Sequence, residues 1–352
     1  MNSFRLRKKG AILIAVLVVL VGYIVYPYFN LYKAKNLDIL SFDSESISLE
    51  IENDVPFTEL ANYLYQKNVI NDTNSFNLLI DYKNYSQSVL KKSKITIQRK
   101  WSNNVLVNQL YLMRNQKIIS LTVPSVRTLE DLANHISKFI SVDFTQLYAS
   151  FTDPAISAKY GFTTVQFPCM FIPNTYEVYA NFNSNQFISF MAKEYKKFWN
   201  SERKKKALKI GLSQSEITIL ASIVQSEQSL KYDEHSTIAG LYLNRLNKNM
   251  KLQADPTVKF ALNKPELRRL YYRHLEVDSP YNTYKYAGLP PGPICIVDPR
   301  VIDAVLNYEK HNYLFMCAQP AYSGYHNFSS TNAQHEKFKK EYTDWLKNEN
   351  IH

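Results

Sequence analysis

The chain has 352 residues, of which 45% are hydrophobic and 14% aromatic, with only 8 glycines and 14 prolines. This composition excludes a fibrous or disordered protein, and the length is enough for two or three compact units with their own cores. The net charge of +11 favours an anionic partner, but the Lys and Arg residues are spread along the chain, and the densest run, "ERKKKALK" at 202–209, is typical of a solvated helix face rather than of a nucleic-acid-binding arm.

The N-terminus carries the clearest regional signal. Basic residues are concentrated in 1–9, and residues 10–32 then run for 23 positions without a charge. A stretch of that length spans a bilayer and its basic flank stays in the cytoplasm. The pattern therefore predicts a single-pass transmembrane helix in the cell membrane, with the bulk of the chain on the extracytoplasmic (periplasmic) side. A cleaved signal peptide is the alternative, but no small-x-small site follows the apolar run, and "YPYFN" indicates an interfacial aromatic anchor.

A strand, a short loop and a helix then recur along the chain. The first copy lies in 46–85, where Thr58 is the expected helix cap, and a second follows at 93–113. A third, at 118–140, has Thr128 as the expected cap before two acidic residues. The recurrence resembles a small LysM-like sugar-binding module, although ordinary α+β scaffolding explains the pattern by itself and is the favoured interpretation of it.

From about residue 185 the pattern becomes helical. An amphipathic segment at 185–211 ends at Gly211, and Ser213 with Glu216 forms a capping box that begins the next helix. The remaining expected elements are a helix at 233–247, a loop-rich stretch at 279–300, a strand at 312–319, a turn containing glycine and a final helix from about 332. Together with the strands at the head of the chain, these elements predict an α+β fold.

A single acid occupies the apolar side of the helix that follows this capping box. At 100° per residue, the stripe contains Leu220, Ile223, Val224 and Glu227. Desolvation there raises a carboxyl pKa, and an acid that stays protonated near neutral pH suits general acid catalysis. The alternative is a buried ion pair, for which Arg245 on the next helix is the available partner. Spacing alone slightly favours the ion pair.

Other chemistries find no support in the residue spacing. The histidines form no HxxxH or HxH pair, and neither a Gly-rich phosphate loop nor a GxSxG elbow is present. Cys169, Cys295 and Cys317 are too few and too far apart for a disulfide framework or a four-cysteine zinc site, so free thiols are favoured. We therefore expect no metal and no cofactor.

Five segments in the second half of the chain carry a family resemblance. They are "LASIVQSEQ", "IAGLYLNRL", "KLQADPTVKFAL", "SPYNTYKYAGLPPGPI" and "YHNFSSTNAQH". In this order they resemble the YceG-like family of endolytic murein transglycosylases, and the resemblance extends over about 46–345. It implies a lyase that acts on peptidoglycan, beside peptidoglycan synthases, and limits the growth of new glycan strands. The implied organisation is a cytoplasmic tail at 1–9, an anchor at 10–32, a connector and LysM-like module at 33–100, and a catalytic domain at 101–352.

The resemblance assigns the catalytic acid to Glu227. Such enzymes use one acid, which protonates the bond oxygen between N-acetylmuramic acid and N-acetylglucosamine and then takes a proton from the muramyl 6-hydroxyl, closing a 1,6-anhydro ring. The chain departs from the family pattern where Gln225 replaces a Glu, Gln228 replaces a Thr and Asn174 replaces an Asp. These changes remove two carboxylates and leave Glu227 as the acid at the end of its helix.

Eight further polar residues are candidates for binding the sugar. Asp255 either steadies the oxocarbenium charge or caps the helix that starts at Pro256, and the cap is favoured because Asp before an N1 proline is a common helix start. The other candidates are Asn244, Gln253, Tyr281, Asn282, Thr283, His326 and Asn327. A catalytically inactive glycan-binding scaffold of the cell wall is the alternative function, and the presence of Glu227 argues against it.

Overall fold

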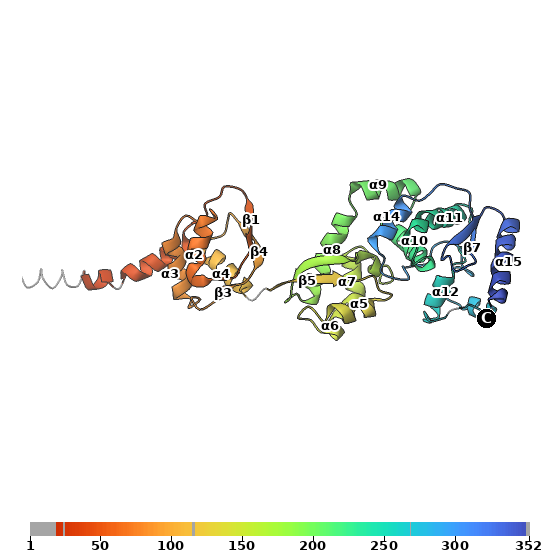
Figure 1. The fold of residues 1–352 in the computed structure, drawn as a ribbon. Coiled ribbons are helices and arrows are strands. Elements are labelled where there is room, and N and C mark those ends of the chain that lie inside the picture. Colours follow the sequence, from red (N-terminus) through yellow and green to blue (C-terminus); the bar gives the residue numbers. More distant parts are fainter. Residues whose placement is uncertain (1–18, 24, 115–116, 268, 350–352) are drawn as a thin grey trace, which may run out of the picture. The chain divides into compact units, whose positions relative to one another are not determined.

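The structure is a computed structural model that describes residues 19–23, 25–114, 117–267 and 269–349. The chain divides into two compact units, whose elements are labelled in Figure 1. The first is Met1–Ile119 with Tyr179–Asn181, and the second is Ser120–Val178 with Phe182–His352. The combination of many helices with short strands confirms the α+β class.

Besides the helical residues 25–36, the described part of the first unit contains short antiparallel strand pairs and further helices. Its elements are β1 (Ser46–Ile51), β2 (Val55–Pro56), α2 (Phe57–Gln66), α3 (Thr73–Tyr82), β3 (Val89–Leu90), β4 (Ser93–Gln98) and α4 (Asn103–Met113). β1 pairs with β4 over its whole length, and β2 pairs with β3. The strand and helix positions predicted in 46–85 and 93–113 are thus confirmed.

Two details of this unit differ from the sequence-based expectation. α2 begins one residue before Thr58, directly after Pro56, so the Thr58 hydroxyl is not its cap. The unit also continues past residue 100, because Leu106, Val107 and Leu110 of α4 are fully buried in its core. The boundary between the two units therefore falls after residue 119.

The predicted membrane anchor is only partly described. Its residues 10–18 and 24 lie outside the described residues, whereas 19–23 and 25–36 are helical. No single helix within the described ranges is long and apolar enough to cross a membrane. By length and composition alone, one pair of helices with a 78° bend between them, Ser201–Ile210 and Gln214–Glu227, meets the criterion.

The second unit combines two small strand pairs with most of the helices. Its strands are β5 (Ile118–Val123) with β6 (Asn174–Tyr179), except for the end residues Ile118, Ile119 and Tyr179, which belong to the first unit, and β7 (Phe315–Ala318) with β8 (His326–Ser329). The helices are α5 (Leu129–Ile136), α6 (Phe144–Thr152), α7 (Pro154–Lys159), α8 (Ser184–Phe198), α9 (Ser201–Ile210), α10 (Gln214–Glu227), α11 (His235–Asn247), α12 (Asp255–Ala261), α13 (Tyr272–Leu275), α14 (Pro299–Leu306) and α15 (Asn332–Asn348), with single 3-10 turns at Phe167–Met170 and Tyr232–Glu234. Thr128 caps α5 in a capping box, as predicted.

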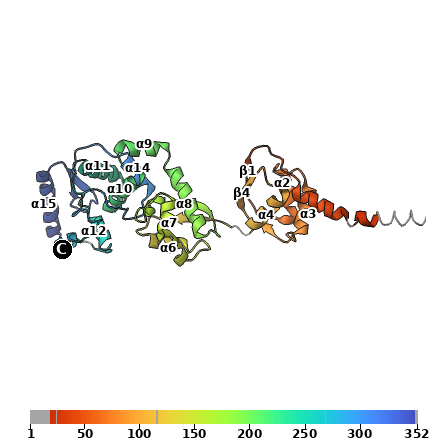
Figure 2. The ribbon, with the colours of Figure 1, turned by 180° about the vertical axis from the view of Figure 1, so that it is seen from behind.

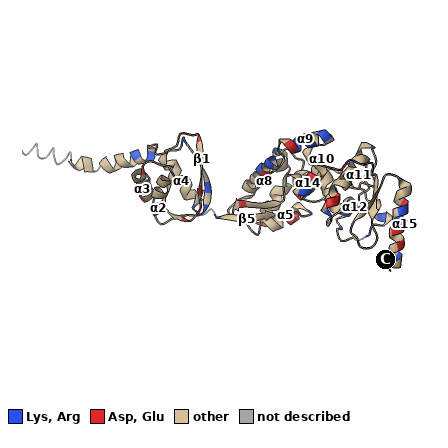
Figure 3. Cartoon of the chain, turned by 45° about the horizontal axis from the view of Figure 1, so that its top comes forward, with Lys and Arg blue, Asp and Glu red and all other residues tan. Residues whose placement is uncertain are grey.

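The amphipathic segment at 185–211 is two helices rather than one. The chain breaks at Trp199, which is buried, and Asn200 caps α9 by accepting a hydrogen bond from the Arg203 amide. Gly211 then ends α9 in the left-handed region, as its sequence position predicts. Lys and Arg residues are frequent on α8 and α9 (Figure 3), and most charged residues of 202–209 are exposed, which confirms the interpretation of this run as a charged helix face.

α10 is the central helix of the second unit. It packs against α9, α11, α12 and α14, and the views in Figures 1 and 2 agree on its position among α9, α11 and α14. Every side chain from Ile217 to Val224 is buried. The helix is therefore enclosed on all sides, rather than on the one apolar stripe read from its sequence, until its last turn reaches the surface of a pocket.

Candidate active site

Glu227 is the last residue of α10. The predicted capping box begins the helix, with Ser213 accepting from the Glu216 amide and Glu216 accepting from the Ser213 amide, and the helix ends where Gln228 turns to an extended conformation. The backbone carbonyls at a helix C-terminus present partial negative charge. This position therefore disfavours an ionised carboxylate and supports the protonated form of Glu227.

A pocket of about 560 Å³ opens at this helix end. Its walls come from the ends of α10 and α11, the segment before α12, the loop at Tyr284, the strand β7 and the final helix α15. The lining side chains are Glu227, Leu241, Tyr242, Arg245, Leu252, Gln253, Asp255, Tyr284, Phe315, Met316, Cys317, Ala318, His326, Asn332, His335, Glu336 and Lys339. The pocket brings four of the sequence-predicted residues together: Glu227, Gln253, Asp255 and His326.

The surroundings of Glu227 raise its pKa to about 7. Burial is the largest cause, and the negative charge of Asp255 acts in the same direction. The Tyr242 hydroxyl donates a 2.6 Å hydrogen bond to Glu227 Oε1 and, with the positive charge of Lys259, opposes the rise in pKa. A carboxyl group with this pKa can both donate and accept a proton near neutral pH.

The ion-pair alternative for Glu227 is wrong. Arg245 lines the same pocket, but its guanidinium donates to the carbonyls of Lys251 and Leu314, each at 2.9 Å, and to Gln253 Oε1. Arg245 therefore holds the segment before α12 beside β7. In the part of the chain that the structure describes, no cation forms an ion pair with Glu227.

Gln253 has an uncommon backbone conformation. Its φ is +54°, in the left-handed region that side chains other than glycine rarely adopt. Three contacts hold it there: its amide donates to the Thr283 carbonyl at 3.1 Å, the next amide, of Ala254, donates to Thr283 Oγ1 at 3.0 Å, and its side chain accepts from Arg245. Such strain is often kept where a side chain must be aimed at a ligand.

The interpretation of Asp255 as a helix cap is wrong. α12 begins at Asp255 itself, with Ala254 in the capping position, and the Asp255 carboxylate accepts a 2.5 Å hydrogen bond from the Tyr284 hydroxyl. Asp255 therefore presents its carboxylate to the pocket beside Glu227, which leaves its charge free to act on the acid and on a bound substrate.

The loop candidates Asn282 and Thr283 are buried and do not line the pocket. Asn282 donates to the carbonyls of Leu275 and Val277, each at 2.8 Å, and Thr283 accepts from the Ala254 amide. Their polar atoms shape the loop that presents Tyr284 and Gln253. Contact with substrate for these two residues stays a prediction.

The other three candidates also lie outside the pocket lining. The Asn244 side chain donates to the carbonyls of His311 and Tyr313, at 2.8 and 3.0 Å. Tyr281 packs on Phe260, with ring centroids 4.8 Å apart, and Asn327 lies in β8. Sugar binding by these three residues stays a prediction.

His326 is oriented by a buried carboxylate. Glu234 Oε2 accepts from His326 Nδ1 at 2.8 Å, and Glu234 Oε1 accepts from the His326 amide at 2.8 Å. Gln228 donates to the same Glu234 at 2.7 Å, and its backbone carbonyl contacts His235 Nε2. The residue after the candidate acid thus ties the end of α10 to the pocket wall that carries His326.

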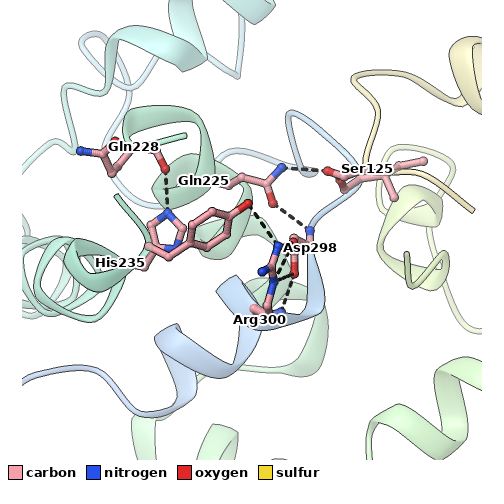
Figure 4. A network of polar contacts seen from close by, with 8 residues as sticks. Ser125, Gln225, Gln228, His235, Asp298 and Arg300 are labelled. Carbon is pink, nitrogen blue, oxygen red and sulfur yellow. Dashed lines mark hydrogen bonds and ion pairs between the residues drawn. The ribbon is translucent and has the colours of Figure 1, made fainter. Parts of the chain in front are cut away.

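Gln225, where the family pattern has a Glu, points away from the pocket. Figure 4 shows its amide between Ser125 and Asp298: Oε1 accepts from the Asp298 amide at 2.7 Å, and Nε2 donates to Ser125 Oγ at 2.9 Å. A Glu here accepts the first bond but cannot donate the second. Asn174 is exposed on β6 and accepts from the Thr175 amide. Both departures therefore lie outside the wall that carries Glu227.

Sequence reasoning missed Tyr242 and Tyr284, the two hydroxyls that contact the pocket carboxylates. Tyr242 is on the apolar pattern of α11 and reads as an ordinary core residue. Tyr284 lies in the segment "SPYNTYKYAGLPPGPI", directly after the candidate residue Thr283. The tyrosine hydroxyl itself could have indicated both residues, because it needs a hydrogen-bond partner wherever the ring is buried.

The fold and this site define a class: an α+β unit with one desolvated carboxylic acid at the wall of an open polar pocket. The chain belongs to the YceG-like family, whose family model matches residues 49–341. It is similar to the endolytic murein transglycosylase of Bacillus subtilis, with 38% identity over 148 residues, which are 42% of this chain and 39% of that protein. It is also similar to the endolytic murein transglycosylase of Streptococcus pneumoniae, with 24% identity over 84% of this chain and 58% of that protein.

Among solved structures, a YceG-like protein of Listeria monocytogenes shares the fold, with a TM-score of 0.54 and 26% identity. The similarity covers 84% of this chain and 99% of that one. The chain spans between two fifths and three fifths of the length of the curated relatives it matches. The family is thus established over most of the chain.

Proposed function

We propose that this protein is an endolytic peptidoglycan lytic transglycosylase whose single acid is Glu227. The observation that carries the proposal is the pocket position of this acid, with a pKa raised to about 7 and a tyrosine hydroxyl 2.6 Å away. The relatives named endolytic murein transglycosylase support the same substrate class.

The chemistry requires one group to act first as an acid and then as a base. Protonated Glu227 gives its proton to the oxygen that joins N-acetylmuramic acid to N-acetylglucosamine, and the muramyl C1–O bond breaks. The Glu227 carboxylate then takes the proton of the muramyl 6-hydroxyl, whose oxygen closes on C1 to give a 1,6-anhydro ring. The Asp255 charge beside it steadies the positive charge that develops at C1. No water enters, so no second carboxylate is needed to activate one.

The test is a digest of purified peptidoglycan by the full chain in detergent, beside Glu227→Gln. We expect anhydromuramyl-ended fragments from the wild type and none from the variant, read by mass spectrometry. Reducing ends contradict the lyase mechanism. Glycan binding without any cleavage by the wild type favours the alternative, an inactive glycan-binding scaffold of the cell wall.

The same proposal places the protein in the cell membrane, with a cytoplasmic N-terminus and the pocket on the extracytoplasmic side. The uncharged stretch at 10–32 supports it, and exposed Val19, Tyr23 and Tyr28 on the described part of that stretch agree. In that location the enzyme limits the length of new strands beside peptidoglycan synthases. Alkaline extraction of membranes tests the anchor, since an anchored chain stays in the pellet.

The first unit is proposed to be LysM-like and to hold glycan. Its strand, two helices and antiparallel return strand support the idea, as does its proximity in sequence to the anchor. Binding of the full chain to insoluble peptidoglycan, compared with a chain lacking residues 44–114, which include α4, provides the test. Undiminished binding by the shortened chain contradicts it.

A further inference from the structure

A second pocket, of about 400 Å³, lies against the same two helix ends as the active site. Ser226 and Pro256 line it, and each is the sequence neighbour of an active-site residue, Glu227 or Asp255. The end of α10 and the start of α12 therefore form a ridge with one pocket on each side. A polymer crossing this ridge passes the candidate acid between the two pockets.

The far wall of the second pocket is fixed to α10. The loop at Ser125 and Val126 runs beside Ile296: the Val126 carbonyl accepts from the Ile296 amide at 2.7 Å, and Ser125 Oγ donates to the Ile296 carbonyl at 2.6 Å. Gln225 completes the link by donating to Ser125 (Figure 4). The pocket wall that ends in Arg127 is thus built into the fold.

Two cations line this pocket without an acidic partner. Arg127 and Lys259 are half-buried, and within the described ranges neither has a carboxylate oxygen within 4.0 Å. The Arg127 guanidinium lies 5.6 Å from the centre of the Phe260 ring, and its hydrogen bond to the Lys259 carbonyl is long at 3.5 Å. Lys259 is also near enough to Glu227 to lower the pKa of that acid. Two neighbouring cations whose N–H donors face a pocket are suited to binding a carboxylate.

We propose that the second pocket binds the glycan strand across the ridge from the active-site pocket, and that Arg127 with Lys259 pairs with a carboxylate carried on the 3-oxygen of a muramyl residue. This inference rests on the proposed function and deepens it. The carboxylate has two sources: the lactyl group itself on strands stripped of peptide, and the stem peptide on strands that retain it. The apolar Phe260 face beside Arg127 offers a surface for the sugar ring.

The test measures kcat/KM on three substrates: stripped strands, stem-bearing strands, and either kind with its carboxylates converted to amides. Since a charge-assisted contact contributes about tenfold in affinity, wild type is expected to prefer carboxylated over amidated strands by about tenfold at low salt. Arg127→Gln is expected to bring this ratio close to one, and Lys259→Gln to reduce it. Lys204→Gln, an exposed charge on α9, is the matched control and keeps the wild-type ratio.

Loss of preference on only one carboxylated substrate identifies the source of the carboxylate. A wild type without preference, or an Arg127→Gln variant that keeps it, overturns the inference while leaving the lyase proposal in place. An absence of anhydromuramyl product from wild type on every substrate instead overturns the proposed function. In that case equilibrium binding of the same three strands still decides the inference.

Discussion

Removing the Tyr242 hydroxyl isolates one of the forces that set the pKa of Glu227. Tyr242→Phe keeps the ring in the core and deletes only the oxygen that donates the 2.6 Å hydrogen bond to Glu227 Oε1. Burial and the neighbouring Glu227 raise the pKa of Tyr242 well above its ordinary value, so the hydroxyl remains a donor throughout the working range. Its hydrogen bond stabilises the ionised acid more than the neutral one.

The size of the effect follows from the strength of such a bond. A hydrogen bond to a charged group contributes about 1.5–3 kcal/mol, which corresponds to about 1–2 pKa units. The pKa of Glu227 is therefore expected to rise from about 7 to between about 8 and 9. Because the protonated form starts the proposed reaction, the variant is expected to stay active at a higher pH than the wild type does.

The assay is the pH dependence of kcat/KM for anhydromuramyl product formation by the two proteins. We expect the decline on the alkaline side to move upward by about 1–2 pH units in the variant. Tyr284→Phe is the matched control, since it deletes the hydroxyl on Asp255 and leaves the contact to Glu227 intact. An alkaline decline that stays in place or moves downward refutes the reasoning, because the Tyr242 bond then does not favour the ionised acid.

Three further predictions concern charges in and beside the pocket. Asp255→Asn removes a negative charge that raises the pKa of Glu227, so the alkaline decline in kcat/KM is expected to move to lower pH, and an upward movement contradicts the charge argument. Glu227→Gln is expected to raise the free energy of unfolding by about 3 kcal/mol above about pH 7 and to leave it unchanged below pH 4.5, because burial raises the pKa of the acid and thus penalises its ionised form. Urea unfolding of both proteins at the two ends of this pH window provides the measurement. A stability difference that does not change with pH contradicts the prediction. Glu234→Gln is expected to lower the free energy of unfolding by about 1–3 kcal/mol in the same assay, because the amide nitrogen of the new side chain cannot accept the hydrogen bonds that Gln228 and His326 now donate to Glu234. Glu336→Gln, an exposed position on α15, is the control.

The helix α10 and the position of Glu227 at its end were predictable because both depend on local pattern. The capping box at Ser213 fixes where α10 begins, and the apolar periodicity carries the helix to Glu227. Thr128 and Gly211 mark element ends by the same local chemistry. The solvent exposure of the charged run on α9 was predictable for a similar reason, since a solvated helix face needs no contact with another segment of the chain.

The partners of the pocket carboxylates were not predictable, because they depend on contacts between distant segments. Tyr242 and Tyr284 reach Glu227 and Asp255 across 15 and 29 positions of sequence. The Arg245 ion pair was a reasonable expectation from proximity in sequence, but backbone carbonyls on two other segments took up its donors. The cap at Asp255 failed for the same reason, since a tyrosine from the loop competes for its carboxylate.

A single acid that must first give and then take a proton works best when neither form is strongly favoured near the working pH. At Glu227, burial, the carbonyl end of α10 and the Asp255 charge favour the neutral form, whereas Tyr242 and Lys259 favour the ionised form. With only the first group of forces, the pKa of the carboxylic acid is too high for it to transfer its proton readily to the bond oxygen. With only the second, it is already ionised before the sugar arrives. The opposition of the two groups places the pKa at about 7, as the proposed mechanism requires of a single side chain that serves both steps without a second carboxylate.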